Sequence, residues 1–518
     1  MTFIPLRNIG SGGIVTDQDP YDLELTQFPN GNNVSFHDGR IGKTLGHTVN
    51  QSLSFQPTHV QGWRFEGSDT VVIGSLQKLY RYDGGSVTNV TKTSDATNYS
   101  NSPRWQSEQL GTAMMFNNGA QVPQYMLPTG ARFADLPAWP SGVITHCLKP
   151  YKSFLIMAGY ESGSTKHPYT VRWSDEYEPT GVPQDYNIGS TTNLAGENVL
   201  SGNNGALVDQ LTLNNSQIIY AERGVFAMDF IGAPLVFSFR ELFSDDGILN
   251  RGAVASFPNG HLVVGNNDIY VHDGNQKQSI VDKRVRKTFF NAVADKRSVF
   301  CQTLNEKSEI WICYADSDAA DSQTANRALV YNWSQNAFTF IDLPNVRALT
   351  LSEKLDASGG YDDATQTWAE TSEYWSSVSA SLDASALSLF GAGYGANKLY
   401  LMNDSHGAAG SNINAYLEAT KLDLDTVLGT ATNTIKQING IYPQIEGQGT
   451  LNISVGVSSS PQDGVTWKAT KTYNIESDNK IDVRASGRYF ALRIESTSDQ
   501  NYWRLTGLDI DIKEVASR

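Results

Sequence analysis

Four short runs of residues decide the fold: Gly62-Trp63-Arg64-Phe65, Val71-Val72-Ile73-Gly74, Leu79-Tyr80-Arg81-Tyr82-Asp83-Gly84 and Val87-Thr88-Asn89-Val90. Each is of strand length and rich in β-branched and aromatic residues, and only a few residues separate one run from the next. This spacing predicts four consecutive antiparallel strands. Asp-Gly and Asn-Gly pairs, such as Asp83-Gly84 and Asp38-Gly39, suit type I′ turns, in which both central residues need positive φ.

Comparable groups of strand-like runs follow along the chain. Four strands in roughly 40–50 residues is the period of a β-propeller blade. No Trp-Asp dipeptide ends these units, so they are not a clear WD40 array, and a long β-sandwich chain remains the alternative. The later units begin near Trp105, Val143, Leu207, Val254 and Val299, and a last one includes Ala386 to Phe390 and Leu399 to Met402.

The last hundred or so residues change character. Leu451 to Val457 alternates strictly between apolar and polar residues, and Leu508-Asp509-Ile510-Asp511-Ile512 is expected to turn both aspartates to solvent. Alternation of this kind is typical of antiparallel sheets packed face to face. The sequence therefore predicts an all-β chain, a β-propeller of about six to eight blades followed by a C-terminal antiparallel β-sandwich.

Three segments are expected on this basis. Residues 1–50 form an N-terminal arm that includes a hairpin at Asn32 to Ile41, residues 51–415 form the propeller with an inserted loop near 352–385, and residues 416–518 form the sandwich. Propellers often add a terminal strand to the last blade, which removes an exposed edge. The arm is expected either to do this or to pack on a neighbouring subunit.

Charge and cysteine content narrow the class of protein. The 518 residues include 39 Lys plus Arg and 54 Asp plus Glu, a net charge of −15, which argues against a protein that grips nucleic acid over a basic face. Three cysteines cannot form a disulfide framework; Cys301 and Cys313 could pair across a hairpin, but free buried thiols, Cys147 among them, are favoured. We expect no signal peptide or membrane span, and folding in a reducing cytoplasm.

The sequence contains only incomplete versions of catalytic and ligand-binding motifs. Gly42-Lys43-Thr44 resembles the end of a phosphate-binding loop, but His37 stands where that loop needs glycine, so a hairpin is favoured. Ser460 to Trp467 resembles the Asp-box of sialidase propellers, with Gln462 where the box has aspartate. The eight histidines show no metal-ligand spacing. The sequence predicts no enzyme, no catalytic residues, no metal and no cofactor.

Two groups of residues are candidate contacts. The dense basic cluster could touch DNA phosphate or acidic residues of another subunit, with a solvated face as the simpler interpretation. The aromatic residues of the inserted loop could form a gate or contact surface, or could be buried in an irregular blade. The basic cluster is Lys283, Arg284, Arg286 and Lys287, and the aromatic residues are Tyr361, Trp368, Tyr374 and Trp375.

Three segments together carry a resemblance to a known family. They are Asn33 to Ile41, then the stretch that includes Phe243 to Ile248, Asn267 to Gly274 and Val285 to Phe290, and the ending from Gly487 to Asp511. These segments resemble the tail nozzle proteins of short-tailed bacteriophages, also called tail tubular protein B or packaged-DNA stabilisation proteins.

The resemblance implies a homo-oligomer, a hexameric ring that retains packaged DNA and passes it during ejection. It implies portal and adaptor proteins above the ring and tail fibre, spike or needle proteins beside it. Assembly would take place in the host cytoplasm, and the protein would then belong to the virion tail. An acidic lumen would let double-stranded DNA pass without sticking. The alternatives are a propeller-based glycan-binding adhesin or tail-associated receptor-binding protein, and a monomeric scaffold.

Overall fold

The computed structural model describes residues 2–65, 68–92, 98–100, 104–200, 202–353, 387–429, 434–499 and 501–516. Within them the chain consists mainly of strands, so the all-β prediction is confirmed. No helix among these residues has the length and apolar content to span a bilayer. The short helices are α1 (Arg286–Ala292), α3 (Asp425–Leu428), and the 3₁₀ turns η1 (Ile9–Ser11), η2 (Pro20–Asp22), η3 (Gly202–Asn204), η4 (Lys296–Ser298) and η5 (Asn305–Lys307).

Five antiparallel sheets follow one another along the chain, and each takes its strands from one continuous stretch of sequence. The first two hold β8 (His59–Phe65), β9 (Ser68–Gly74), β10 (Leu79–Tyr82) and β11 (Val87–Asn89), then β12 (Gln106–Leu110), β13 (Ala113–Asn117), β14 (Gln124–Met126) and β15 (Ala134–Asp135). The third holds β16 (Val143–Thr145), β17 (Leu148–Tyr151), β18 (Phe154–Ser162), β19 (Thr165–Trp173) and β20 (Gly196–Val199). The last two hold β21 (Leu207–Leu213), β22 (Ser216–Ala221), β23 (Gly224–Gly232) and β24 (Val236–Ser244), then β25 (Val254–Phe257), β26 (Gly260–Val264), β27 (Ile269–His272) and β28 (Lys277–Ser279).

A larger sheet of seven strands comes next, and one long strand divides it. The 17-residue β32 pairs with β31 through its first part and with β33 through its second, on either side of a register shift. The last strand of this sheet, β7, comes from the N-terminal part of the chain and pairs with β34. Its strands are β29 (Phe300–Leu304), β30 (Glu309–Tyr314), β31 (Ala325–Asn332), β32 (Ala337–Glu353), β33 (Leu387–Gly393), β34 (Lys398–Met402) and β7 (His47–Ser52).

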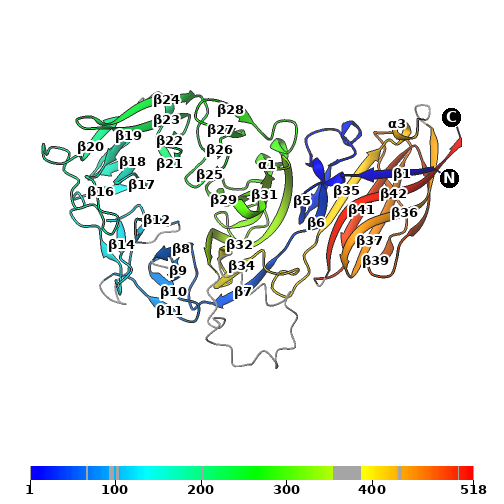
Figure 1. Cartoon of the computed structure of the whole chain (residues 1–518), viewed down its shortest axis with the longest axis horizontal. Helices are drawn as coiled ribbons and strands as arrows, with labels where there is room; N and C mark the ends of the chain where they lie inside the picture. The colour runs from blue at the N-terminus through cyan, green and yellow to red at the C-terminus, as the bar shows by residue number, and fades with distance from the viewer. Residues whose placement is uncertain are drawn as a thin grey trace, which may run out of the picture.

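These sheets are arranged around a common centre (Figure 1). Contacts run in sequence from β8 to β12, β17, β21, β25, β29 and β32, and β32 contacts β8 again. We call this circuit, from β8 to β34 with β7, the sheet ring. Apolar side chains of neighbouring sheets pack together between them; Trp63, Val72, Trp105 and Phe116, for example, belong to one cluster shared by the first two sheets.

Two further antiparallel sheets of six strands lie beside the ring, at the right of Figure 1. We call them the C-terminal sheets. Their facing apolar side chains, including Ile441, Ile453, Leu505 and Ile510, belong to one core. One sheet holds β40 (Ile481–Gly487), β36 (Ile435–Gln448), β42 (Tyr502–Ala516), β6 (Arg40–Lys43), β5 (Val34–His37) and β1 (Thr2–Arg7); the other holds β38 (Thr466–Trp467), β37 (Thr450–Ser458), β41 (Tyr489–Ser496), β35 (Tyr416–Leu422), β4 (Asn30–Asn32) and β39 (Lys471–Asn474).

The N-terminal segment joins both parts of the molecule. β1, β5 and β6 extend one C-terminal sheet and β4 extends the other, while β7 completes the large sheet of the ring. Between them, β2 (Gly13–Ile14) and β3 (Gln27–Phe28) form a short parallel pair. Residues 2–52 therefore tie the ring to the C-terminal sheets through backbone hydrogen bonds on both sides.

Turn chemistry matches the sequence prediction in one hairpin and not in another. Asp38 and Gly39 have φ of 50° and 71° and connect β5 directly to β6, as a type I′ turn requires. A Cβ on Gly39 would lie 1.7 Å from the Asn8 Oδ1 atom, so glycine is needed there. For Asp83-Gly84 the type I′ prediction is wrong: the loop joining β10 to β11 is longer, and only Gly84 has positive φ.

The prediction that both aspartates of β42 face solvent is also partly wrong. Asp509 is half-buried and pairs with Arg7 at 2.8 Å, and Asp511 is 2% exposed. Phe3 of β1 and Gly440 of β36 flank Asp511 in register. The burial follows from strands on both sides of β42, one of which comes from the far end of the sequence.

Candidate functional site at the junction of ring and C-terminal sheets

The basic cluster is placed beside the N-terminal segment. The Arg284 guanidinium donates hydrogen bonds to the carbonyl oxygens of Asn336 (2.6 Å) and Gly12 (3.3 Å) and lies 4.9 Å from the centre of the Phe338 ring. Burial lowers the pKa of Arg284. Its side chain is thus occupied within the chain, where it holds residue 12 against the ring.

The other three members of the cluster point to different surroundings. Arg286 donates to the Asn267 carbonyl at 2.9 Å and pairs with Asp282 at 3.3 Å. Lys283 and Lys287 are exposed. The structure therefore separates the four residues into two that bond within the chain and two that face solvent. The four predicted gate or contact residues, Tyr361, Trp368, Tyr374 and Trp375, lie outside the described residues.

Charged side chains link neighbouring sheets inside the ring. The Lys149 ammonium, on β17, lies 3.3 Å from Asp209 Oδ1 on β21 and 3.6 Å from Glu108 Oε1 on β12. Asp209 is 1% exposed and also accepts the backbone N–H of Gly252 at 2.8 Å. Burial alone would lower the pKa of Lys149, but the two carboxylates outweigh it and raise the pKa. Lys149 therefore stays charged at neutral pH.

Two arginines cross the interior of the ring at one end. Arg104, which precedes β12, donates to the carbonyls of Arg297 and Val299 at the start of the large sheet. Arg251, which precedes β25, donates to the carbonyls of His146 and Arg104. Burial lowers the pKa of Arg104 to about 10, and the nearby Arg251 charge adds to this effect. Because these bonds join sheets that are not neighbours, side chains bridge the centre of the ring.

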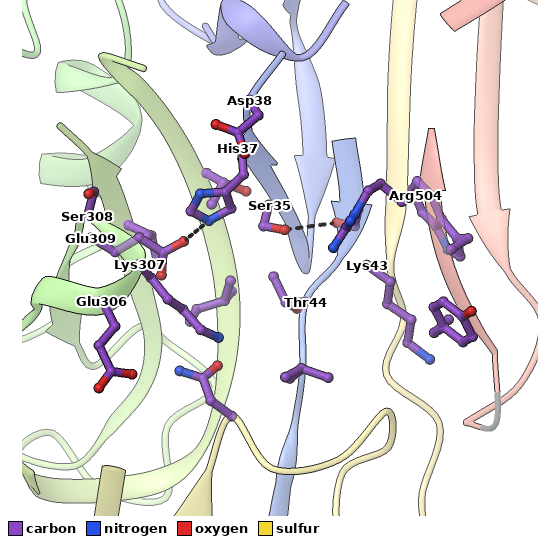
Figure 2. Close-up of a pocket in the computed structure, with 18 of the residues that line it drawn as sticks. Ser35, His37, Asp38, Lys43, Thr44, Glu306, Lys307, Ser308, Glu309 and Arg504 are labelled. Carbon is purple, nitrogen blue, oxygen red and sulfur yellow. Dashed lines mark hydrogen bonds and ion pairs between the residues drawn. The ribbon is translucent and has the colours of Figure 1, made fainter. Parts of the chain in front are cut away.

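A cleft of about 740 Å³ lies where the ring meets the C-terminal sheets. Figure 2 shows its walls: Glu306, Lys307 and Glu309 come from the ring side, and Lys43 and Arg504 come from β6 and β42 on the other. Sequence reasoning did not identify this site, because its walls come from segments that are distant in the sequence. We call it the junction cleft.

The two lysines of the junction cleft are partly removed from water, and each has a carboxylate in its surroundings. Lys43 is 8% exposed, and its ammonium donates to a single carbonyl, that of Ser498, at 3.1 Å. Burial lowers the pKa of Lys43 to about 8, although the carboxylate of Asp499 opposes the shift. Burial also lowers the pKa of Lys307, against the opposing charges of Glu309 and Glu306. At both lysines the effect of burial therefore outweighs that of the neighbouring carboxylates.

The carboxylates of the cleft are differently placed. Glu309, which is buried, accepts hydrogen bonds from Trp311 Nε1 at 3.0 Å and lies 2.8 Å from His37 Nε2, the contact drawn in Figure 2. Glu446 lies 3.8 Å from Arg40. Asp38 and Glu306 are exposed. The buried carboxylate is thus occupied by protein donors.

One sequence motif does fall in the cleft. Gly42-Lys43-Thr44 is the end of strand β6 and its continuation, so the hairpin interpretation is confirmed and no helix follows as in a phosphate-binding loop. Lys43 and Thr44 nevertheless line the cleft. The signal available in the sequence was the position of Lys43 two residues after Ile41, which puts a lysine on the face of β6 that carries buried side chains.

Groups that could hold a metal are not found among the described residues, where no three His, Cys, Asp or Glu side chains cluster suitably. The carboxylates of the Asp316–Asp321 loop pair instead with arginines, Asp316 with Arg327 at 2.6 Å and Asp321 with Arg347 at 2.8 Å. All three cysteines are free.

Comparison with known proteins adds no family to this description. No family model matches the chain, and no curated protein matches it.

Proposed function

We propose that the chain is a structural component of a phage virion tail, a nozzle or head–tail connector that forms a ring-shaped channel as a homo-oligomer. In this proposal the sheet ring is a seven-bladed β-propeller and the C-terminal sheets are a β-sandwich. Antiparallel sheets arranged in a circuit, four of them four-stranded, with β7 completing the seven-stranded last one, are the features expected of a propeller.

One observation carries the proposal. Three stretches within the segments that resemble tail nozzle proteins are far apart in the sequence, yet each contacts the N-terminal segment or forms part of it. Residues 33–41 form the β5–β6 hairpin, whose Ile41 pairs with Leu505 of β42 in the C-terminal segment. The segment around residues 285–290 holds α1, which is bound by Asp17 of the N-terminal segment. A resemblance that coincides with one structural junction supports a shared architecture.

The bridged interior of the ring bears on where DNA would pass. Arg104 and Arg251 join sheets across the centre, and Glu108, Lys149 and Asp209 link three neighbouring sheets there. Duplex DNA cannot use this space in a single subunit. The channel of the proposal is therefore formed between subunits, around the axis of a ring that we infer to be a hexamer.

The net charge of −15 is compatible with this role. Surfaces that carry excess negative charge repel phosphate, so packaged DNA would slide past them rather than bind. The remaining parts of the proposal are contact with portal or adaptor proteins above and with fibre, spike or needle proteins beside the ring, assembly in the host cytoplasm, and a final place in the virion tail.

Imaging of the purified protein tests the proposal. Electron microscopy and native mass measurement of the full chain, alone and with portal-side neighbours, should show a ring with an axial hole. A monomer that stays monomeric and docks to none of these proteins would overturn the channel proposal. Glycan screening would then test the adhesin alternative.

A further inference from the structure

We propose that an exposed apolar surface on the third and fourth sheets of the ring binds a second copy of this chain, at the exposed apolar residues of that copy's strands β1 and β42. This inference rests on the proposed homo-oligomer and names the two surfaces that join its subunits. We call the first surface the apolar tip; its exposed residues are Ile188, Val199, Phe230, Ile231 and Leu235.

Exposed large apolar side chains are unevenly distributed over the molecule. Among the described residues, none is exposed between positions 53 and 168 or between positions 236 and 386. Apart from Val49 and Leu387 of the large sheet, they lie on the third and fourth sheets or in the N-terminal segment and C-terminal sheets. Figure 1 shows these two groups at opposite ends of the longest axis. A different protein would cover one end, whereas a second copy of the chain covers both.

The apolar tip surrounds a groove between two sheet edges. The groove, of about 540 Å³, is lined by residues of β20 and β24, each the last strand of its sheet. Ile188 and Leu235 lie on its walls, and the Phe237 ring between the walls is 5.8 Å from that of Phe230. Val199 ends β20. The surface is therefore hollowed and apolar, as at the centre of a protein interface.

The area of the apolar tip matches a stable interface. Its five side chains are 41–70% exposed, and side chains of this size bury roughly 150–250 Å² each, so together they present roughly 400–500 Å². A standard interface buries about 800 Å² on each partner, of which a little over half is apolar. The tip supplies that apolar share.

The other surface is formed by strands from the two ends of the chain. Phe3 of β1 and Val515 of β42 are each 52% exposed, and the Phe3 ring packs edge-on against Tyr442 at 5.6 Å. The charges beside the two surfaces are opposite in sign. Glu197, the charged residue among those lining the groove, is exposed, and Lys513 on β42 is exposed beside Val515. Opposite charges at the rim favour this pairing over the contact of two identical surfaces.

A contact between two different surfaces leaves one of each free on every pair of copies. Such head-to-tail contacts close into a ring when the rotation between copies allows it, and otherwise form a filament. The proposed hexameric ring requires this kind of contact.

Native mass spectrometry and sedimentation of the full chain test the contact. Leu235→Arg places a charge on the apolar tip and should raise the Kd between copies about tenfold or more. Phe3→Arg should do the same from the other surface. Asp511 lies opposite Phe3 in register, so the new guanidinium has a carboxylate beside it and β1 should stay paired.

A mixture of the two variants gives the sharpest result. Each variant keeps one intact surface, so equal amounts of Leu235→Arg and Phe3→Arg should form a one-to-one dimer that cannot grow. Leu387→Arg is the matched control, an exposed leucine outside both surfaces that lies opposite Glu353 in register, and should assemble like the unaltered chain. Thermal unfolding of each variant shows that it is folded.

The outcomes separate this contact from the proposed function. If the unaltered chain forms a ring and Leu235→Arg forms it equally well, or if the mixed variants stay monomeric, the contact is wrong and the homo-oligomer stands. If the unaltered chain stays monomeric alone and with its portal-side neighbours, the proposed function is overturned and this contact with it.

Discussion

Asp17 caps the first turn of helix α1 from a segment 270 positions earlier in the chain, its Oδ2 accepting a hydrogen bond from the backbone N–H of Lys287 at 2.7 Å. The residue at the N-cap position of this helix, Val285, has no side chain that can do so. The Thr16 and Thr288 hydroxyls lie 2.6 Å apart beside this contact. A distant carboxylate thus satisfies a helix terminus that the local sequence leaves open.

Removal of this cap should destabilise the protein. Asp17→Ala is expected to lower the free energy of unfolding by about 1 kcal/mol, the usual cost of losing a capping side chain. The midpoint of urea unfolding measures it. Asp22→Ala, an exposed carboxylate of the same segment with no hydrogen bond to its side chain, is the matched control and should have little effect. Equal effects of the two variants would mean that Asp17 does not cap α1.

Lys149 should be among the most sensitive positions inside the ring. Lys149→Met leaves the buried carboxylate of Asp209 without its ion pair, and loss of one partner of a buried pair costs roughly 3–5 kcal/mol. The double variant Lys149→Met/Asp209→Asn should recover part of this loss, because the amide keeps an acceptor for Gly252. Equilibrium unfolding of the three proteins measures it, and a double variant less stable than Lys149→Met would contradict the expectation.

A buried hydrogen-bond chain assigns the protonation of two histidines. His261 Nε2 faces the Thr212 carbonyl at 3.0 Å, so it carries the proton and its Nδ1 accepts from the Tyr220 hydroxyl at 2.7 Å. Tyr220 in turn accepts from His272 Nε2 at 2.7 Å, and His272 Nδ1 accepts the Gly274 N–H at 3.3 Å. Neither ring has room for a second proton without placing two donors face to face.

This series of hydrogen bonds predicts that the free energy of unfolding depends on pH. Burial lowers the pKa of His261 to about 4, and burial together with the His261 charge lowers that of His272 to about 4. The unfolded chain binds these protons near pH 6.5, so between about pH 6.5 and 4 it holds more protons than the folded chain. The free energy of unfolding should therefore fall on acidification, by up to about 1.4 kcal/mol per pH unit for each histidine.

Urea unfolding at a series of pH values measures this slope. His47 and His59, with pKa values lowered to about 4 and about 3, contribute in the same direction. The variant His261→Gln/His272→Gln should flatten the slope, whatever its effect on stability at neutral pH. His167→Gln, which alters a histidine stacked on Tyr160 in the third sheet, serves as the control. If the double substitution leaves the pH slope unaltered, His261 and His272 are not the source of that slope.

The three thiols should be unreactive in the folded protein. Cys147 and Cys313 are buried and Cys301 is half-buried, and burial raises the pKa of each above its usual value. Since the thiolate is the nucleophile, labelling by DTNB should be slow at neutral pH and should reach three thiols only in denaturant. Fast native labelling of any one of them would contradict this placement.

Local pattern predicted the strands well, because alternation along a strand records which face is buried. Runs such as Val71 to Gly74 and Leu79 to Tyr82 lie in strands β9 and β10. The pattern failed at Asp511, where neighbouring strands bury a polar residue, and at Asp83-Gly84, where loop length set the turn. The junction cleft was not predicted at all, because no local pattern shows which distant segments will meet.

By itself the sequence determined an all-β chain with short antiparallel strands, a change of character near residue 416, and an excess of negative charge. These properties depend on composition and on neighbours within a few residues. The tertiary structure decided that residues 2–52 pair with both parts of the molecule, that Arg104 and Arg251 bridge the centre of the ring, and that segments around Lys43, Lys307 and Arg504 line one cleft. Strand pairing and side-chain approach over hundreds of positions depend on how all the sheets pack, so only the folded chain brings them together.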